Sequence, residues 1–210
     1  MPERIFIFGA SGHAKVVLDA ARLQGYEVCL LFDDNPVLAG GRFMDCAVVG
    51  GRDVLPSWCK EQGVSAGIVA IGQNRPRVAV AESLRAAGLR LVSVVHPGAI
   101  VAAGVRIGAG SVLMAGAVVN SDAVLGDDCI VNTGACIDHD CELGDGVHVA
   151  PGCHLCGNVR VGTGSLIGAG STVIPGIRIG ARALVGAGST VIRDVPDDAR
   201  VAGSPCRELK

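Results

Sequence analysis

The pattern of apolar residues changes character part-way along the chain. Up to about residue 95, short apolar runs alternate with stretches in which apolar residues recur at helical spacing. Strands that alternate with helices in this way are typical of a small parallel sheet, so we predict an α/β domain over residues 1–95. The predicted strands span 4–8, 27–32, 67–71 and 90–95, and the predicted helices span 14–23, 53–62 and 77–87.

The second pattern is a strict six-residue repeat. From Val101 to Val191 every sixth residue is Val, Ile or Leu, and the residue four places later is usually small. A hexapeptide period is the signature of a parallel β-helix, in which three hexads form a coil of about 18 residues. The aliphatic residue fills a prism and the small residue fits at its corner. We therefore predict an all-β domain of about five coils over residues 96–210, with a short C-terminal tail.

The composition supports this division. The chain of 210 residues is 50% hydrophobic but only 3% aromatic, and all six aromatic residues precede residue 59. Rings do not fit inside a narrow prism, which explains why they stop before the repeat begins. The formal net charge is −2 and no long apolar run is present, so we expect neither a nucleic-acid partner nor insertion into a membrane.

Nine cysteines occur without a CxxC pair or a secretory signal, which indicates reduced thiols and a cytoplasmic protein. Cys129, Cys141 and Cys153 fall on the small interior position of the repeat, where a thiol serves as a small hydrophobe. Cys136 and Cys156 fall elsewhere, so an acyl-cysteine reaction stays open, although neither has an evident basic neighbour. We expect no metal site.

The pair His139-Asp140 stands out within the repeat. It lies between the inward positions Ile137 and Cys141, so we expect it on an outward corner of the prism. A carboxylate beside an imidazole favours the imidazolium form and raises the basicity of the ring. Nothing in the packing of the repeat requires a histidine there. A general base and a simple solvated polar corner are both compatible with this pattern.

The loop after the first predicted strand suggests a ligand site. Gly9 and Gly12 follow that strand and open a helix, an arrangement that presents backbone N–H groups to an anion. Asp33 and Asp34 end the next strand, where an acid commonly meets a ribose hydroxyl in Rossmann-like folds. The full GxGxxG motif of dinucleotide-binding enzymes is absent, which counts against an NAD-dependent dehydrogenase. From the residues alone, a structural tight turn remains an alternative.

Taken together, several segments resemble one known family. They are Phe8-Gly9-Ala10-Ser11-Gly12-His13-Ala14, Phe32-Asp33-Asp34, Val69-Ala70-Ile71-Gly72-Gln73-Asn74, His96-Pro97, Ile137-Asp138-His139-Asp140-Cys141 and Val201-Ala202-Gly203-Ser204-Pro205. Over nearly its whole length the chain is similar to the hexapeptide-repeat sugar acetyltransferases, specifically the sialic acid O-acetyltransferase and nucleotide-aminosugar N-acetyltransferase family. The resemblance implies a Rossmann-like domain followed by a left-handed β-helix.

The resemblance also implies roles for individual residues. His139 would be the general base and Asp140 the acid that tunes it, while His148 would contact acetyl-CoA. Ala169 and Ala187 would line the acetyl-CoA channel. The residues that would hold a nucleotide sugar are Ser11, Gly12, His13, Asp33, Asp34 and Gly72. No role maps onto His154, and Cys206 replaces a small apolar residue that is usual in the family.

The implied reaction moves acetyl from acetyl-CoA to the amino group of a nucleotide-linked amino-deoxy sugar, such as a UDP- or GDP-linked 4-amino sugar. O-acetylation of sialic acid or a related sugar, and a non-catalytic nucleotide-sugar-binding trimer, remain alternatives. His148 lies nine residues from His139, half a coil away and on another side of the prism. We therefore expect a homotrimer with sites between subunits, as the family also implies.

Overall fold

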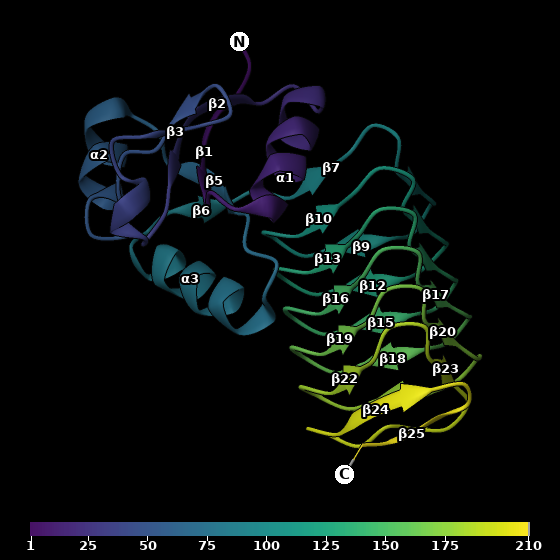
Figure 1. The fold of residues 1–210 in the computed structure, drawn as a ribbon. Coiled ribbons are helices and arrows are strands. Elements are labelled where there is room, and N and C mark those ends of the chain that lie inside the picture. Colours follow the sequence, from purple (N-terminus) through teal and green to yellow (C-terminus); the bar gives the residue numbers. More distant parts are fainter. Residues whose placement is uncertain (210) are drawn as a thin grey trace. The chain divides into compact units, whose positions relative to one another are not determined.

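A computed structural model describes residues 1–209 of the chain. The chain divides into two compact units, Met1–Pro97 and a second unit that starts at Gly98. Figure 1 shows helices and short strands in the first unit and a stack of strands in the second. Across residues 1–209, none of the helices combines the length and the apolar character needed to cross a membrane.

The first unit contains a four-stranded parallel sheet in the order β2-β1-β5-β6. Its apolar strands are largely buried, and Phe6 and Phe32 meet edge to face with ring centroids 6.1 Å apart. The elements are β1 (Arg4–Phe8), α1 (Gly12–Leu23), β2 (Glu27–Phe32), a 3-10 turn (Pro36–Leu38), β3 (Arg42–Phe43), β4 (Cys46–Ala47), α2 (Leu55–Gln62), β5 (Ala66–Val69), α3 (Asn74–Ala86), β6 (Arg90–Leu91) and β7 (Val94–Val95). This confirms the predicted α/β class.

The strand order places a topological switch point between β1 and β5. The chain leaves β1 toward β2 and leaves β5 toward β6, on opposite sides, so the loops at the two carboxyl ends diverge. Ligands of open α/β sheets bind in the crevice at such a point. The loops start in close contact, because a β-carbon at Gly9 would lie 2.8 Å from the Ala70 carbonyl oxygen. Gly9 also has a φ of +115°, which a residue with a side chain rarely adopts.

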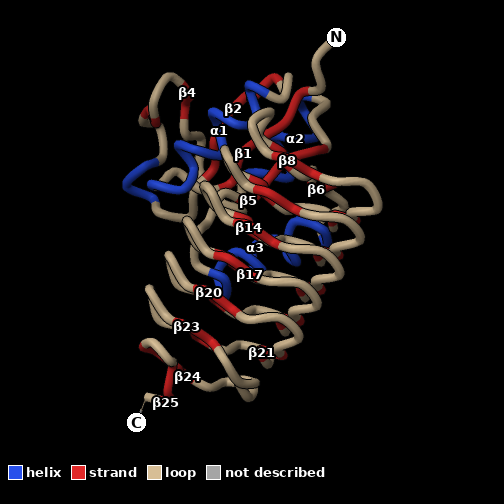
Figure 2. The backbone as a smooth tube through the Cα atoms, turned by 90° about the vertical axis from the view of Figure 1, so that its right-hand side faces the viewer, coloured by secondary structure: helices blue, strands red, loops and turns tan. Residues whose placement is uncertain are grey.

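The second unit is a parallel β-helix with three faces, each a stack of short strands, most of them of two residues (Figure 2). The first face consists of β10 (Val112–Leu113), β13 (Ile130–Val131), β16 (His148–Val149), β19 (Leu166–Ile167), β22 (Leu184–Val185) and β24 (Arg200–Gly203), with β25 (Cys206–Glu208) antiparallel to β24. The second face consists of β8 (Ile100–Val101), β11 (Val118–Val119), β14 (Cys136–Ile137), β17 (His154–Leu155), β20 (Thr172–Val173) and β23 (Thr190–Val191). The third face consists of β9 (Arg106–Ile107), β12 (Val124–Leu125), β15 (Glu142–Leu143), β18 (Arg160–Val161) and β21 (Arg178–Ile179).

The predicted interior of the prism is confirmed. The repeat positions from Leu113 to Val191 are all buried, none more than 4% exposed, whereas Val101 and Ile107 on the first turn are partly exposed. The small cysteines of the repeat, Cys129, Cys141 and Cys153, are fully buried free thiols, as expected. The solenoid has about six turns rather than five, since β24 and a bridge at Val195 extend the stack past the last hexad.

Two local predictions in the first unit need correction, and one small element was missed. Helix α3 begins at Asn74 instead of residue 77, because Pro76 is tolerated in a first helical turn, where N–H groups have no intrahelical partner. The strand predicted at 90–95 is two strands, β6 and β7, interrupted after Leu91. The small hairpin β3–β4 was not predicted, since strands of two residues carry no readable alternation.

Candidate active site

His139 and Asp140 form the corner between β14 and β15, where the second face meets the third. Asp140 adopts a left-handed backbone with φ of 58°, which Asp tolerates better than most residues. Its Oδ2 lies 2.7 Å from His139 Nδ1. Both side chains are more than half exposed, so a substrate can reach them. The sequence expectation of an outward corner is met.

The electrostatics of this corner favour a base. The hydrogen bond that Asp140 accepts from the ring, followed by the negative charge of Asp138, raises the pKa of His139 above its usual value. Because Nδ1 faces the Asp140 carboxylate, Nε2 is the ring nitrogen left to accept a proton.

A second carboxylate, which the sequence argument did not single out, orders the backbone of the corner. Asp138 Oδ1 accepts a hydrogen bond from the His139 N–H at 2.8 Å. The same oxygen accepts a hydrogen bond from Asn120 Nδ2, one turn earlier, at 3.0 Å. Asp directly before a turn commonly bonds to the backbone in this way, which is the signal that would have identified it.

Gly157 is the second feature that the sequence did not reveal. It occupies the position of His139 on the following turn, and a β-carbon there would lie 2.6 Å from His139 Cε1 and 2.7 Å from Nε2. Only glycine therefore leaves room for the imidazole. Gly157 is buried, and within residues 1–209 its N–H has no hydrogen-bond acceptor. A backbone donor thus stands close to the candidate base.

The other residues expected to contact acetyl-CoA lie elsewhere on the β-helix. His148 is on β16 of the first face, with Nε2 3.2 Å from Asn132 Nδ2. Ala169 and Ala187 occupy the same corner on successive turns, between the first and second faces, and both are exposed. A single chain therefore brings the two alanines together but keeps His148 on a different face from β14, which precedes His139.

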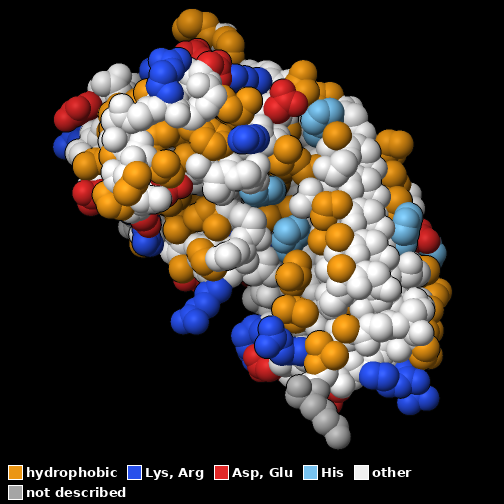
Figure 3. Space-filling view, in the orientation of Figure 1, with side chains coloured by type: hydrophobic (Ala, Val, Ile, Leu, Met, Phe, Trp, Pro, Cys, Tyr) orange, Lys and Arg blue, Asp and Glu red, His pale blue; other side chains and the backbone are white. Residues whose placement is uncertain are grey.

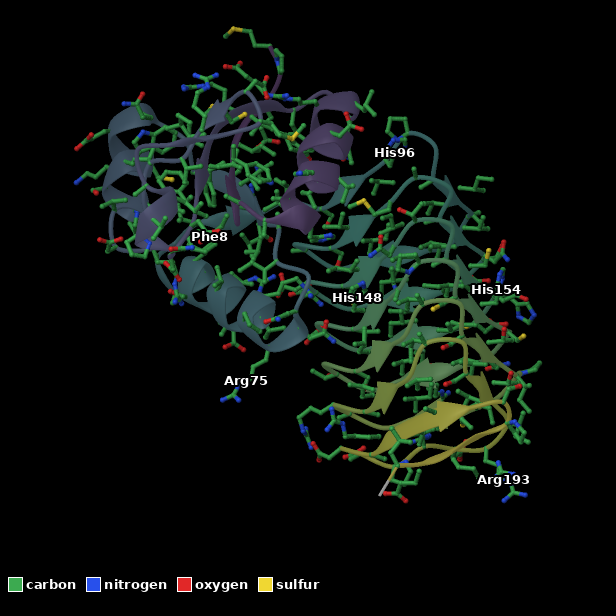
Figure 4. The ribbon with its side chains drawn as sticks, in the orientation of Figure 1. Phe8, Arg75, His96, His148, His154 and Arg193 are labelled. Carbon is green, nitrogen blue, oxygen red and sulfur yellow. The ribbon has the colours of Figure 1, made fainter. Side chains whose placement is uncertain are left out.

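His154 lies on β17, on a different strand and face from His148 (Figure 4). It is the register partner of Cys136 on the neighbouring strand, so the expectation that this cysteine lacks a basic neighbour is wrong. Residues 18 apart in the sequence stack on the same face of the β-helix, which places His154 beside Cys136. The Cys136 thiol nevertheless faces the Gly134 carbonyl oxygen at 4.0 Å. Within residues 1–209, no group of three metal-ligating side chains is close enough to hold a metal ion.

In the first unit, the two acids expected at a nucleotide are both engaged by the protein. Asp33 accepts hydrogen bonds from the N–H groups of Ala10 and Asn35, at 2.8 and 2.9 Å. Asp34 pairs with Arg52 at 2.8 Å and accepts a hydrogen bond from its N–H group. Asp33 therefore ties the end of β2 to the loop that opens α1, which orders the loop itself.

The residues of the α1 loop differ in their surroundings. Ser11 and Gly12 are exposed, and Ser11 caps the helix without a side-chain hydrogen bond. His13 is mostly buried, and within residues 1–209 its Nε2 has no hydrogen-bond partner. Burial, followed by the positive charge of Arg77, lowers the pKa of His13 to about 4, so the ring is neutral at physiological pH. A β-carbon at Gly72 would lie 3.7 Å from the His13 β-carbon, so these two residues face each other across the switch point.

Comparison with known families matches both units. Residues 4–84 match the PglD N-terminal domain. Residues 122–157 and 140–175 match the bacterial transferase hexapeptide, a unit of six repeats.

Solved structures match the whole chain. PerB from Caulobacter crescentus, in complex with CoA and GDP-perosamine, is 41% identical with a TM-score of 0.94, and the match covers 100% of this chain and 98% of that one. The chain belongs to the hexapeptide-repeat sugar acetyltransferases. The acetyltransferase domain of PglB from Neisseria gonorrhoeae, in complex with acetyl coenzyme A, is 37% identical with a TM-score of 0.91, and each chain is covered completely. WeeI from Acinetobacter baumannii is 26% identical with a TM-score of 0.86, covering 98% of this chain and 100% of that one.

This membership agrees with the architecture of both units. The fold is a Rossmann-like α/β domain followed by a left-handed parallel β-helix, as the sequence implied.

Proposed function

We propose that this protein transfers the acetyl group of acetyl-CoA to the amino group of a nucleotide-linked amino-deoxy sugar. The observation that carries the proposal is the His139–Asp140 pair, an exposed imidazole with raised pKa that lies against Gly157. The relatives solved with CoA and GDP-perosamine, or with acetyl coenzyme A, support this substrate class.

In the proposed reaction, His139 acts as the general base. The sugar reacts as its free amine, because a protonated amine has no lone pair, and His139 Nε2 takes a proton from the nitrogen as it attacks the thioester carbonyl. The carbon–sulfur bond then breaks, the amide forms, and the coenzyme leaves as a thiol after taking up the proton. Asp140 holds the Nδ1 side of the ring and stabilises the imidazolium in between.

The oxyanion that develops on the thioester oxygen needs a hydrogen-bond donor. We assign this role to the Gly157 N–H, since it lies next to the His139 ring and has no acceptor within residues 1–209. Preorganised backbone donors of this kind contribute strongly because they need no reorganisation during the reaction.

We assign the nucleotide sugar to the switch-point crevice of the first unit. The exposed start of α1, at Ser11 and Gly12, offers helix N-terminal N–H groups to a diphosphate. Neutral His13 and the backbone of Gly72 line the opposite walls. Asp33 and Asp34 complete the set at the end of β2, where their carboxylates also order the loops.

We further propose that the protein works as a homotrimer, in which the β-helix of a second subunit supplies His148, Ala169 and Ala187 to acetyl-CoA. The partly exposed outward residues of the first face, His148, Leu166 and Leu184, and the outward residues of the second face are apolar, small or histidine. The third face instead carries Arg106, Glu142, Arg160 and Arg178. Apolar side chains are visible on the first face in Figure 3. Interface cores are depleted in charge, so the first and second faces suit subunit contacts.

We place this reaction in the cytoplasm. The nine cysteines of the protein are free thiols, a state that is stable in a reducing compartment. Acetyl-CoA is also a cytosolic metabolite.

The decisive assay incubates the protein with acetyl-CoA and a panel of UDP- and GDP-linked 4-amino sugars, and follows the products by mass spectrometry. The expected result is one added acetyl group on an amino sugar and none on the matching 4-hydroxy sugar. Acetylation of the hydroxy sugar or of sialic acid instead would identify an O-acetyltransferase. Nucleotide-sugar binding without any transfer would identify a binding protein.

A further inference from the structure

Arg77 is the largest fully buried side chain in the part of the chain that the structure describes. It lies in the first turn of α3, near the positive end of the helix dipole. A buried guanidinium is costly unless acceptors surround it, and this helix end makes the position worse for a cation. A residue that tolerates two such penalties needs a specific set of partners.

Three hydrogen bonds tie Arg77 to the segment that leads from β5 into α3. Arg77 Nη1 donates to the carbonyl oxygens of Ile71 and Gly72, at 3.2 and 3.1 Å. Arg77 Nη2 donates to Asn74 Oδ1 at 3.0 Å. One rigid guanidinium thus fixes two neighbouring carbonyl groups of the loop and the first residue of α3, which a flexible ammonium could not do with the same geometry.

The loop that Arg77 fixes follows β5 at the switch point of the sheet. Gly72 faces His13, which lies in the first turn of α1. Arg77 also acts on His13 through its charge, which is the second cause, after burial, of the lowered pKa of His13. The same side chain therefore fixes the Gly72 loop and adds to the effect of burial that keeps the His13 ring neutral.

We propose that Arg77 is a positioning residue for the nucleotide sugar, which holds the Gly72 loop at the spacing from His13 that the ligand requires. This inference rests on the proposed function, because it assigns the crevice to that ligand. Arg77 does not touch the substrate itself, since its side chain is fully buried.

The test compares R77M and R77K with R75M, a control on the same helix whose side chain is exposed (Figure 4). Calorimetry with GDP and UDP measures nucleotide binding, and steady-state kinetics measure KM for each substrate. R77M is expected to weaken nucleotide binding and raise KM for the nucleotide sugar by roughly tenfold or more, a size typical for hydrogen bonds to a charged group. KM for acetyl-CoA should be unchanged, and R77K should lie between R77M and wild type.

A second readout separates positioning from simple loss of stability. An NMR titration of His13 should show its pKa rising toward the usual histidine value in R77M but not in R75M. Wild-type nucleotide affinity and an unshifted His13 in folded R77M would overturn the proposal. If R77M does not fold, R77K decides by the same measurements. If the wild type binds nucleotides but transfers no acetyl group, the proposed function is refuted and the role of Arg77 is not. If the wild type transfers acetyl normally and the Arg77 variants keep wild-type nucleotide affinity and KM, only the role of Arg77 is refuted.

Discussion

The imidazole of His139 lies against Gly157 of the following turn, so closely that a β-carbon at Gly157 would come within 2.6 Å of Cε1. The residue at this corner position is Ser121 one turn before His139 and glycine one turn after it. The φ of Gly157 is not in the left-handed region, so the backbone conformation does not require glycine here. Glycine is required by the contact with the His139 ring. The orientation of the base thus depends on a residue that bears no side chain.

The first prediction follows from this contact. G157A should tilt the His139 ring and lower kcat by about 10- to 100-fold, since small misplacements of a reacting group are costly. S121A changes the equivalent, exposed corner position without approaching the ring, and should leave kcat unchanged. Steady-state kinetics of both variants check this. Equal rates for G157A and wild type would show that the ring position does not matter.

The second prediction concerns pH. Only neutral His139 can accept a proton, so activity is lost below its pKa, which Asp140 raises. D140N should lower that pKa, move the acid limb of the kcat/KM profile to lower pH, and reduce the plateau rate by about tenfold or more because the base is weaker. The control is D122N, at the same left-handed corner position one turn earlier. An acid limb that stays in place in D140N contradicts the assignment of His139.

The third prediction tests the thiols. Burial raises the pKa of Cys141 to about 11, so this thiol should resist iodoacetamide at neutral pH, whereas the partly exposed Cys136 and Cys156 should react. C136S and C156S should keep most of their activity, because attack on the thioester is direct. Peptide mass spectrometry and kinetics measure both effects. Loss of activity in C136S, together with an acetylated thiol in wild type, would favour the acyl-cysteine route through the neighbouring His154.

The fourth prediction tests the site between subunits. H139A and H148A should each be nearly inactive, but trimers mixed in equal amounts from the two should regain about a quarter of wild-type activity. That fraction arises because one of four neighbour pairings joins an intact His139 to an intact His148 in a cyclic trimer. Unfolding and refolding the two variants together, with sedimentation to verify the trimer, provides the measurement. Mixed trimers without activity would place both residues in one subunit's site.

The repeat made much of the β-helix predictable from sequence. Because residues 18 apart stack, the register alone places His139 on a corner and Ala169 beside Ala187 in one column, at the corner that follows the face of His148. The same arithmetic also pairs Cys136 with His154, so that contact was within reach of the sequence.

Other features depend on atoms that no pattern reports. The approach of the His139 ring to Gly157 requires a side-chain rotamer, and the engagement of Asp33 with the Ala10 N–H requires the path of a loop. Arg77 runs against expectation, because arginine is rarely fully buried and a sequence gives no reason to place it inside.

The most direct test of the central claim compares wild type with H139N, using acetyl-CoA and a GDP- or UDP-linked 4-amino sugar and measuring the acetylated product by mass spectrometry. Asparagine keeps a polar side chain at the corner but provides no base. The wild type should N-acetylate the sugar, and H139N should do so at a rate at least about 100-fold lower, with nucleotide-sugar binding retained. A near-normal rate for H139N would show that His139 is not the general base.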